Sequence, residues 1–393
     1  MREVVIVGGM RTPIADFLGS LKDFSAVELG IIALKAALKQ AKLEPSLIEE
    51  VTAGMGNSSG CKPNPARQIA LGSGCTFETV AATVNQQCAS SMRATEILAQ
   101  EIMLGKVDTG AAVGPESMSN IPYLLPGSRK GYRMGNAQVV DGMFVDGLID
   151  AFNDYHMGVT GENLAKKYNI SRLEQDELAV LSHQRACQAI KDKKFNSEIV
   201  PVEIKKKKVS LLFETDEHPK VNTNLTDLAK LKPAFDREGT VTPGNASGLN
   251  DAGAALILMT MDKAKELGCK PLARIIATAS GAVDPSLMGM GVVPAVNRAL
   301  KFANLKLDDI GYWEINEAFA AQFIACNREL KLDMAKVNGN GSGISLGHPV
   351  SCTGARLIVS LVYEMRRRGV RYGCASLCAG GGPGTAIIVE TVF

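Results

Sequence analysis

The chain has no apolar run long enough to cross a membrane and no excess of charge of either sign. Its 393 residues include 43 lysines and arginines against 41 aspartates and glutamates, which gives a net charge of +2. A nearly neutral chain has no general attraction for nucleic acid or for an anionic membrane surface, so any anion site must be local. A membrane-spanning helix needs about 20 apolar residues in succession. We therefore expect neither nucleic acid nor a membrane as a partner.

Histidines and paired metal-ligand motifs are also scarce. The sequence holds four histidines and nine cysteines, and the cysteines lack the paired CxxC spacing of zinc sites. Nine is an odd number, and a disulfide framework is not expected in a chain of this length. The N-terminus MREVVIVGGMRTP is too short in its apolar run for a signal peptide. These features predict no metal, reduced thiols and a cytoplasmic protein.

Apolar residues (46%) and charged residues (21%) occur in the proportions of a folded globular chain, and the length predicts two or three domains. Short β-branched segments alternate with amphipathic ones. Strands are expected near residues 4–7, 51–55, 82–85, 107–113, 255–259, 274–279, 310–315 and 385–390, and helices near 26–43, 88–104, 171–193, 294–303, 316–330 and 354–367. This alternation predicts an α/β fold with helices on both faces of a sheet.

The alternation is interrupted between about residues 121 and 249, where glycine, asparagine, proline and charged residues are frequent. The segments on either side resemble each other, since CASSMRA at 88–94 and SCTGAR at 351–356 each open a helix that leads to a strand. We therefore predict two similar α/β halves, with the irregular region inserted into the first. Four lysines at 205–208 lie in that region, and we favour a solvated strand edge or turn over a phosphate site.

Cys88, in VNQQCASSMRA, lies between a predicted strand and a predicted helix. A thiol there faces the positive end of the helix dipole. Such a position lowers the pKa of a thiol and favours the nucleophilic thiolate, so Cys88 is a candidate nucleophile. The alternative is an inert, buried cysteine.

Three further residues lie in segments suited to chemistry. His348 stands in the glycine-rich segment NGNGSGISLGHP and is a candidate base, or else a loop or capping histidine. Cys378 precedes GGGPG, whose N–H groups could stabilise an oxyanion, although the segment could be only a hairpin turn. Asn316 opens NEAFAAQF, where it could cap a helix or orient a water or a carbonyl group.

These segments occur together in one order. VNQQCASSMRA is followed by HMGVTGENLA, GTVTPGNASGLNDAGAALILM, NEAFAAQF, GNGSGISLGHP and CAGGGPGTA. The set resembles the thiolase family, and within it the short-chain acetyl-CoA acetyltransferases, over essentially the whole chain. The resemblance implies the thiolase fold, two similar five-stranded α/β halves layered α-β-α-β-α. It also implies an N-terminal domain at 1–268, with an inserted loop region at about 120–248, and a C-terminal domain at 269–393.

The resemblance implies a reversible, ping-pong condensation of two acetyl-CoA into acetoacetyl-CoA and CoA, a reaction of fatty acid metabolism. Cys88 would carry the acyl group as a thioester, His348 would accept the Cys88 proton, and Cys378 would be the second acid and base. One oxyanion hole would use His348 and a water held by Asn316. The other would use the N–H groups of Cys88 and Gly380.

The resemblance also implies a substrate pocket and a homo-oligomer, either a dimer or a homotetramer. Ser247 would meet the pantetheine of an acyl-CoA. The other implied pocket residues, for which core packing is the alternative in the phenylalanines and methionines, are His156, Met157, Phe235, Met288, Ala318 and Phe319. No cofactor is implied, because coenzyme A is a substrate and product.

The chain departs from the family pattern close to these motifs. Ala-Ser-Ser follows Cys88 where Gly-Ser-Gly is usual, Ser351 replaces a glycine and Cys352 follows it, and Val292 and Pro383 stand at two other unusual positions. These changes raise the question of a reshaped acyl pocket. A broader 3-ketoacyl-CoA thiolase is therefore the first alternative. A decarboxylating ketoacyl synthase is a weaker one, because that chemistry usually uses a cysteine with two histidines and this sequence has no second histidine motif beside that of His348. A non-catalytic acyl-CoA-binding protein is the alternative from another class.

Overall fold

The computed structural model describes residues 2–206 and 209–392. One large sheet runs through both halves of the chain. Its strands are β1 (Val4–Arg11), β2 (Ala15–Asp16), β3 (Glu50–Gly54), β4 (Val80–Val84), β5 (Thr109–Ser117), β10 (Asn250–Thr260), β11 (Ala273–Ala282), β12 (Tyr312–Ile315), β13 (Tyr372–Cys378) and β14 (Pro383–Thr391). Their order is β12-β13-β14-β11-β1-β10-β5-β3-β4, with β2 paired to β10. The halves join where β1 and β11 pair antiparallel through Val5–Arg274 and Ile6–Ala273.

Helices of ordinary length cover this sheet and fill the space between its halves. The helices are α1 (Ala26–Ala41), α2 (Pro65–Gly72), α3 (Ser90–Leu104), α4 (Gly158–Lys167), α5 (Arg172–Lys191), α6 (Leu225–Leu228), α7 (Met261–Glu266), α8 (Val292–Ala303), α9 (Ala320–Leu330), α10 (Gly343–Leu346) and α11 (Thr353–Arg368). Short 3₁₀ or π-helical segments occur at η1 (Pro45–Leu47), η2 (Gln87–Ala89), η3 (Met118–Asn120), η4 (Phe144–Leu148), η5 (Lys194–Ser197), η6 (Pro285–Gly291) and η7 (Leu307–Asp309).

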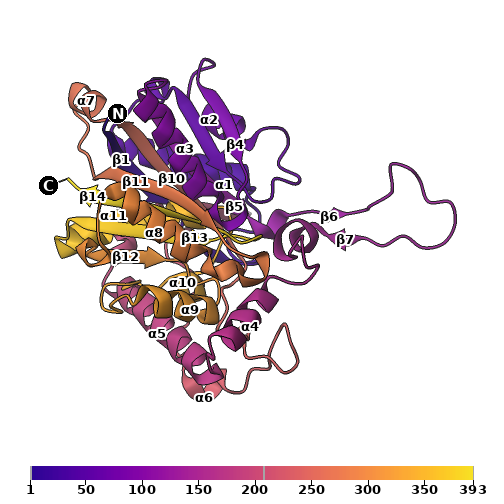
Figure 1. The fold of residues 1–393 in the computed structure, drawn as a ribbon. Helices are drawn as coiled ribbons and strands as arrows, with labels where there is room; N and C mark the ends of the chain where they lie inside the picture. The colour runs from indigo at the N-terminus through magenta and orange to yellow at the C-terminus, as the bar shows by residue number, and fades with distance from the viewer. Residues whose placement is uncertain (1, 207–208, 393) are drawn as a thin grey trace.

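The layers follow the predicted order α-β-α-β-α (Figure 1). α1 and α2 cover the outer face of the N-terminal strands, α3 and α11 pack against each other between the halves, and α8 covers β11, β13 and β14. The strands are apolar on both faces because alternate side chains enter two different cores, as β1 illustrates. Val5 and Val7 pack in the core beneath α1, whereas Val4 and Ile6 pack in the central core with α3 and α11.

Two details of the C-terminal half differ from the expectation. In the described residues this half adds four strands to the sheet, β11 to β14, and a single parallel bridge between Trp313 and Val337 stands where a fifth was expected. The helix expected from residue 316 begins at Ala320 instead. A bridge between Ala246 and Phe319 keeps the preceding residues extended, so Asn316 does not cap the helix.

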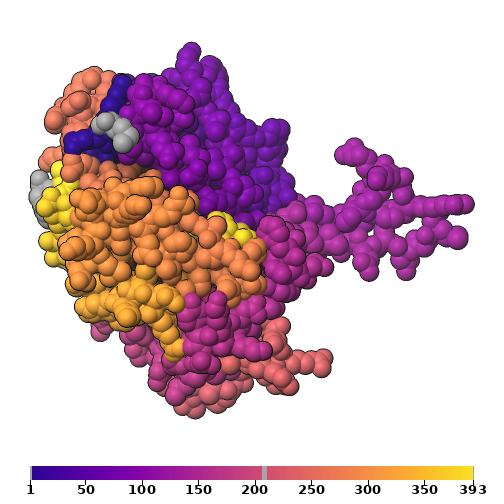
Figure 2. Space-filling view, in the orientation of Figure 1, coloured from indigo at the N-terminus to yellow at the C-terminus, as the bar shows by residue number. Residues whose placement is uncertain are grey.

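The inserted region is more regular than its composition indicated. The helix predicted near 171–193 forms as α5 and opens with a capping box, in which the Ser171 hydroxyl accepts from the Glu174 N–H (3.2 Å). α4 was not expected, because it contains two glycines and no side chain caps it. The hairpin of β6 (Tyr123–Leu124) and β7 (Val140–Asp141) carries an arm that projects from the body (Figures 1 and 2).

A second hairpin, of β8 (Val202–Lys206) and β9 (Val209–Phe213), contains the lysine run. Lys205 is exposed in β8, as expected for a solvated strand edge, whereas Lys207 and Lys208 lie outside the described residues. Across the part of the chain that the structure describes, no helix is both long enough and apolar enough for a membrane crossing.

A buried cluster of charges ties the first strand to the inserted region. Arg11 is fully buried and donates to Glu198 Oε1 (2.7 Å) and to both carboxylate oxygens of Asp216 (2.7 and 2.9 Å). Asp216 also accepts from the Ile14 N–H (2.8 Å). Removing one partner of such a group leaves a buried charge without compensation.

We therefore expect Asp216→Ala to lower the free energy of unfolding by about 3 kcal/mol. Urea denaturation followed by circular dichroism measures this change. The matched control is Asp227→Ala, which removes the partner of Lys230 in an exposed pair and is expected to leave the urea midpoint unchanged. Equal midpoints for Asp216→Ala and the unmodified protein would contradict a structural role for this cluster.

Candidate active site

Cys88 stands in a tight turn between β4 and α3. The preceding residue, Gln87, has a left-handed backbone conformation with φ of 49°. The Ser90 hydroxyl donates to the Gln87 carbonyl (2.6 Å) and accepts from the Gln86 N–H (2.9 Å). These bonds fix the turn, so that Cys88 faces a cavity instead of the interior of the sheet.

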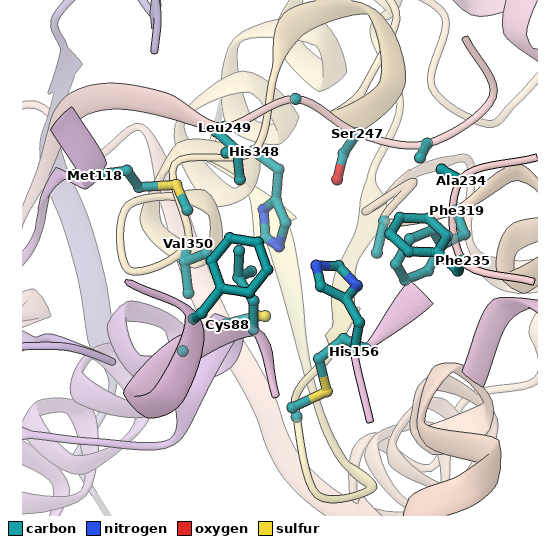
Figure 3. Close-up of a pocket in the computed structure, with 18 of the residues that line it drawn as sticks. Cys88, Met118, His156, Ala234, Phe235, Ser247, Leu249, Phe319, His348 and Val350 are labelled. Carbon is teal, nitrogen blue, oxygen red and sulfur yellow. The ribbon is translucent and has the colours of Figure 1, made fainter. Parts of the chain in front are cut away.

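The cavity has a volume of about 410 Å³. It is bordered by ten of the twelve predicted site residues, namely Cys88, His156, Met157, Phe235, Ser247, Met288, Ala318, Phe319, His348 and Gly380. Figure 3 shows Cys88, His348, His156 and Ser247 directed into the same space. Residues that are up to about 290 positions apart in the sequence therefore share one site.

The other two predicted residues lie behind the cavity wall. Cys378 ends β13, is 1% exposed and lies close enough to Cys88 for a charge on one thiol to raise the pKa of the other. Asn316 is fully buried, and its Nδ2 lies 3.4 Å from Nε2 and 3.5 Å from Nδ1 of His348. The structure thus places both residues beside the two central groups, Cys88 and His348.

The segment after Cys378 is both a hairpin turn and part of the site. It connects the antiparallel strands β13 and β14, and Gly381 and Gly382 adopt positive φ values of 87° and 101°. The Gly380 N–H points at the Cys88 sulfur and acts to lower its pKa. A Cβ on Gly380 would stand 2.6 Å from the terminal methyl of Met157, so only glycine can occupy this position without moving the pocket wall.

The predicted lowering of the Cys88 pKa is wrong. Burial raises the pKa of Cys88 to about 11, and this effect outweighs the N–H groups of Gly380 and Cys88. Burial also raises the pKa of Cys378 well above its usual range, and the nearby Cys88 adds to the increase. Both sulfurs therefore carry their protons at neutral pH, and nucleophilic attack by Cys88 requires a base.

His348 can act as that base because it is neutral. Burial lowers its pKa to about 3, and the charge of Arg356 lowers it further. Its backbone N–H donates to Asn250 Oδ1 (2.9 Å), which fixes the end of the glycine-rich loop. A neutral imidazole in contact with the cavity can take a proton transiently and return it.

Aromatic rings form one wall of the cavity. The His156 ring stacks on Phe235 with 4.5 Å between ring centroids and 17° between planes, and it meets Phe144 edge-on at 5.6 Å. Burial lowers the pKa of His156, which favours the neutral ring. Over residues 2–206 and 209–392, no three His, Cys, Asp or Glu side chains are grouped to hold a metal ion.

Ten residues of the wall were not predicted, namely Met118, Phe144, Gly147, Leu148, Ala234, Pro243, Ala246, Gly248, Leu249 and Val350. Four of them, Pro243, Ala246, Gly248 and Leu249, surround Ser247 in the quoted segment GTVTPGNASGLNDAGAALILM, so that motif could have indicated them. The others lie outside the quoted motifs. Phe144 and Leu148 belong to a turn of π-helix, a form common at functional sites, but nothing in the sequence indicates it.

The departures from the family pattern lie outside the wall. Within the described chain, none of Ala89, Ser90, Ser91, Val292, Ser351, Cys352 and Pro383 borders the cavity. Two of them make contacts that a glycine could not make. Ser91 Oγ accepts from the Ala355 N–H (2.9 Å), and Ser351 Oγ accepts from the Gly56 N–H (2.7 Å). These two serines brace the loops behind the site, and the departures add no side chain to the described cavity wall.

Two family models match the chain, "Thiolase, N-terminal domain" over residues 4–262 and "Thiolase, C-terminal domain" over residues 269–391. The chain therefore belongs to the thiolase family. Within that family it is similar to proteins named acetyl-CoA acetyltransferase. The protein of that name from Syntrophomonas wolfei is 48% identical over the full length of both chains, and the one from Cupriavidus necator is 48% identical over 99% of this chain and 100% of its own.

Solved structures agree with this placement. The structure of the Syntrophomonas wolfei acetyl-CoA acetyltransferase has a TM-score of 0.98 at 47% identity and covers all of both chains. Human mitochondrial 3-ketoacyl-CoA thiolase in complex with CoA has a TM-score of 0.96 at 40% identity and covers 100% of this chain and 98% of its own. The predicted thiolase fold is confirmed.

Below the Cys88 pKa of about 11, the thiolate fraction rises about tenfold for each unit of increase in pH. We expect the rate of Cys88 alkylation by iodoacetamide to rise roughly tenfold per pH unit between pH 7 and pH 9. Peptide mass spectrometry at timed intervals measures modification at Cys88 separately from the other cysteines. A plateau below pH 8 would show instead that the resting thiol is already ionised.

Proposed function

We propose that this thiolase-family enzyme is an acetyl-CoA C-acetyltransferase, which condenses two acetyl-CoA into acetoacetyl-CoA and CoA, reversibly and by a ping-pong route. The chain is an acyltransferase, and its relatives named acetyl-CoA acetyltransferase match it over their full length. The observation that carries the proposal is the convergence of Cys88, His348 and the Gly380 N–H on one apolar cavity.

In the first half-reaction the Cys88 sulfur attacks the carbonyl carbon of acetyl-CoA, and the thiol proton passes to the His348 ring. The bond between the acetyl group and CoA breaks, and the CoA thiolate takes a proton from Cys378. The products are acetyl-Cys88 and free CoA. Since the N–H groups of Gly380 and Cys88 face the sulfur, they support the carbonyl oxygen of the acyl group formed on it.

In the second half-reaction the Cys378 thiolate removes an α-proton from a second acetyl-CoA. The resulting carbanion attacks the carbonyl carbon of acetyl-Cys88, and the new carbon–carbon bond forms as the bond to sulfur breaks. The Cys88 thiolate then recovers its proton from His348. Asn316 Oδ1 is buried without a hydrogen-bond partner among the described groups, which supports the expectation that it holds a water for the second oxyanion hole.

The shape of the cavity favours a short acyl chain. Met157 packs directly against Gly380, next to the place where the acyl group would form, and Phe319 and Met288 border the same cavity. Ser247, which is on the cavity wall and has its backbone N–H bonded to the Ala318 carbonyl (2.9 Å), is the proposed contact for pantetheine. His156, Phe235 and Ala318 complete the proposed pocket.

A broader 3-ketoacyl-CoA thiolase is the second candidate. It is favoured by the likeness to the human mitochondrial 3-ketoacyl-CoA thiolase, which has a TM-score of 0.97 at 41% identity. The two candidates share the chemistry of Cys88 and differ in the acyl chain accepted. Activity measured over a series of acyl-CoA lengths separates them.

We expect incubation with acetyl-CoA to place one acetyl group on Cys88 and to release one CoA, and we expect neither result for Cys88→Ser. Intact-protein and peptide mass spectrometry measure the adduct. The thiolysis rate should fall steeply from acetoacetyl-CoA to 3-ketooctanoyl-CoA, because the wall beside Cys88 is closed by Met157. The control is Cys61→Ser, since Cys61 is absent from the cavity wall.

Each other outcome points to one alternative. Acetylation of Cys88 with a preference for the longer substrates would assign the broader thiolase. Binding of acyl-CoA without acetylation and without CoA release would assign a non-catalytic acyl-CoA-binding protein.

No metal or redox cofactor is part of the proposal, because proton transfers and fixed N–H donors account for each step, and CoA enters only as substrate and product. All nine cysteines lie in the described residues as free thiols, which supports a reducing compartment, and we place the enzyme in the cytoplasm. The reaction assigns it to fatty acid metabolism. Acyl-CoA is the proposed partner, and the near-neutral charge gives no general attraction for nucleic acid or for an anionic membrane surface.

A homo-oligomer, a dimer or a tetramer, is proposed from two exposed apolar surfaces. β4 is the last strand of the main sheet, and its Val80 is 58% exposed. An uncovered apolar edge strand invites pairing with a second copy. The β6–β7 arm exposes Met134 at 96% and Tyr123 at 68%, and a projecting arm of this kind gains stability by packing on another subunit.

Replacing residues 125–139 by Asn-Gly would close the β6–β7 hairpin at the pair Leu124–Val140. We expect this variant to form a smaller assembly than the unmodified protein and to retain Cys88 acetylation. Size-exclusion chromatography with light scattering measures the mass. The control is Phe302→Ser, which removes an exposed apolar side chain from α8. An unchanged mass for the shortened arm would exclude it from the assembly.

A further inference from the structure

The hydroxyl of Thr353 lies against the candidate base. Thr353 is the first residue of α11, is fully buried, and its Oγ1 is 2.6 Å from Nδ1 of His348. The same hydroxyl is 3.0 Å from the Pro349 carbonyl, to which it can donate its proton. Thr353 does not border the cavity among the described residues and so makes no contact with substrate there.

From this geometry we propose that Thr353 is a positioning residue, which holds His348 in the tautomer with its proton on Nδ1 and leaves Nε2 free to accept the proton of Cys88. The inference rests on the proposed function, because it gives His348 the role of base toward Cys88. It adds a residue that acts through His348 and not on the substrate.

The neighbours of the ring decide which nitrogen carries the proton. Asn316 Nδ2 lies 3.4 Å from Nε2 and 3.5 Å from Nδ1 of His348, so this amide does not favour one ring nitrogen over the other. The hydroxyl of Thr353 distinguishes them, because it lies 2.6 Å from Nδ1 and donates its hydrogen to the Pro349 carbonyl (3.0 Å). Its oxygen can therefore only accept from the ring, and Nδ1 carries the hydrogen. A hydroxyl has one hydrogen and two lone pairs, so it can fill both roles at once.

Hydrogen bonds at both its backbone and its side chain hold His348 in this arrangement. Asn250 Oδ1 holds the backbone N–H of His348 at 2.9 Å, and Asn250 Nδ2 donates to the Ala15 carbonyl (3.0 Å). The loop is thus fixed at its backbone by Asn250 and at its side chain by Thr353. A partner that orients an imidazole and fixes its tautomer is the third member of many nucleophile–base pairs.

A neutral hydroxyl suits this task better than a carboxylate would. A carboxylate on Nδ1 would favour the charged imidazolium, whereas the base proposed here must be neutral at rest and charged only during the reaction. Arg356, on the same helix as Thr353, also disfavours the charged ring. Thr353 therefore orients His348 without making it cationic.

The variant Thr353→Val removes the hydroxyl and keeps the shape. We expect kcat and the single-turnover rate of Cys88 acetylation to fall about 10- to 100-fold, the range typical of outer partners of an imidazole, with KM for acetyl-CoA within about twofold. Thr353→Ser keeps the hydroxyl and should restore most of the rate. The matched control is Thr95→Val, since Thr95 is a buried helical threonine whose hydroxyl donates to the Ser91 carbonyl four residues back (2.9 Å).

A second measurement depends on no variant. ¹⁵N spectra of histidine-labelled, unmodified enzyme report the tautomer of each of the four histidines, and His348→Asn identifies the signal. We expect the Nδ1–H form for His348 in the unmodified enzyme and a mixture in Thr353→Val. An Nε2–H form in the unmodified enzyme overturns the inference, even if the valine variant fails to fold.

The other outcomes separate this inference from the proposed function. If the unmodified enzyme is never acetylated at Cys88, the proposed function fails. If the unmodified enzyme is acetylated at Cys88 and Thr353→Val is acetylated at the same rate, the proposed function stands and the role of Thr353 is rejected. A serine variant as slow as the valine variant would assign the effect to packing of the methyl group and reject the inference as well.

Discussion

The site depends on the close packing of α3 against α11 between the two halves of the sheet. A Cβ on Gly354 of α11 would stand 2.5 Å from the backbone nitrogen of Met92 in α3, so the two helices approach at backbone distance. The bond from the Ala355 N–H to Ser91 Oγ fixes their register. Cys88 lies just before the first helix and His348 just before the second. This single contact therefore brings the proposed nucleophile and base together.

Burial at this interface sets the chemistry. The same enclosure that raises the pKa of Cys88 to about 11 lowers the pKa of His348 to about 3. Both groups are neutral at rest, so a proton must move at the moment of reaction. Directed N–H groups of Gly380 and Cys88 then act in a poorly solvated space, where fixed dipoles are most effective. Precise orientation matters more here than permanent charge.

The sequence predicted the main elements because their patterns are local. The buried strand β1 and the helices α3, α5 and α11 all lie close to the ranges that the local pattern predicted. Errors arose where distant segments decide the outcome. The bridge between Ala246 and Phe319 delays α9, and apolar enclosure outweighs the helix dipole at Cys88. The residues next to Asn316 and Cys88 in the sequence indicate neither effect.

The sequence by itself determined the alternating strands and helices and the two similar halves, and it supplied the candidate nucleophile and base, because each of these follows from short runs of neighbouring residues. Only the tertiary structure decided which side chains close the cavity, such as Phe144 and Val350, and which tautomer and protonation state the buried groups adopt. These properties depend on solvent exclusion and on contacts between residues far apart in the chain, and no local pattern specifies either of them.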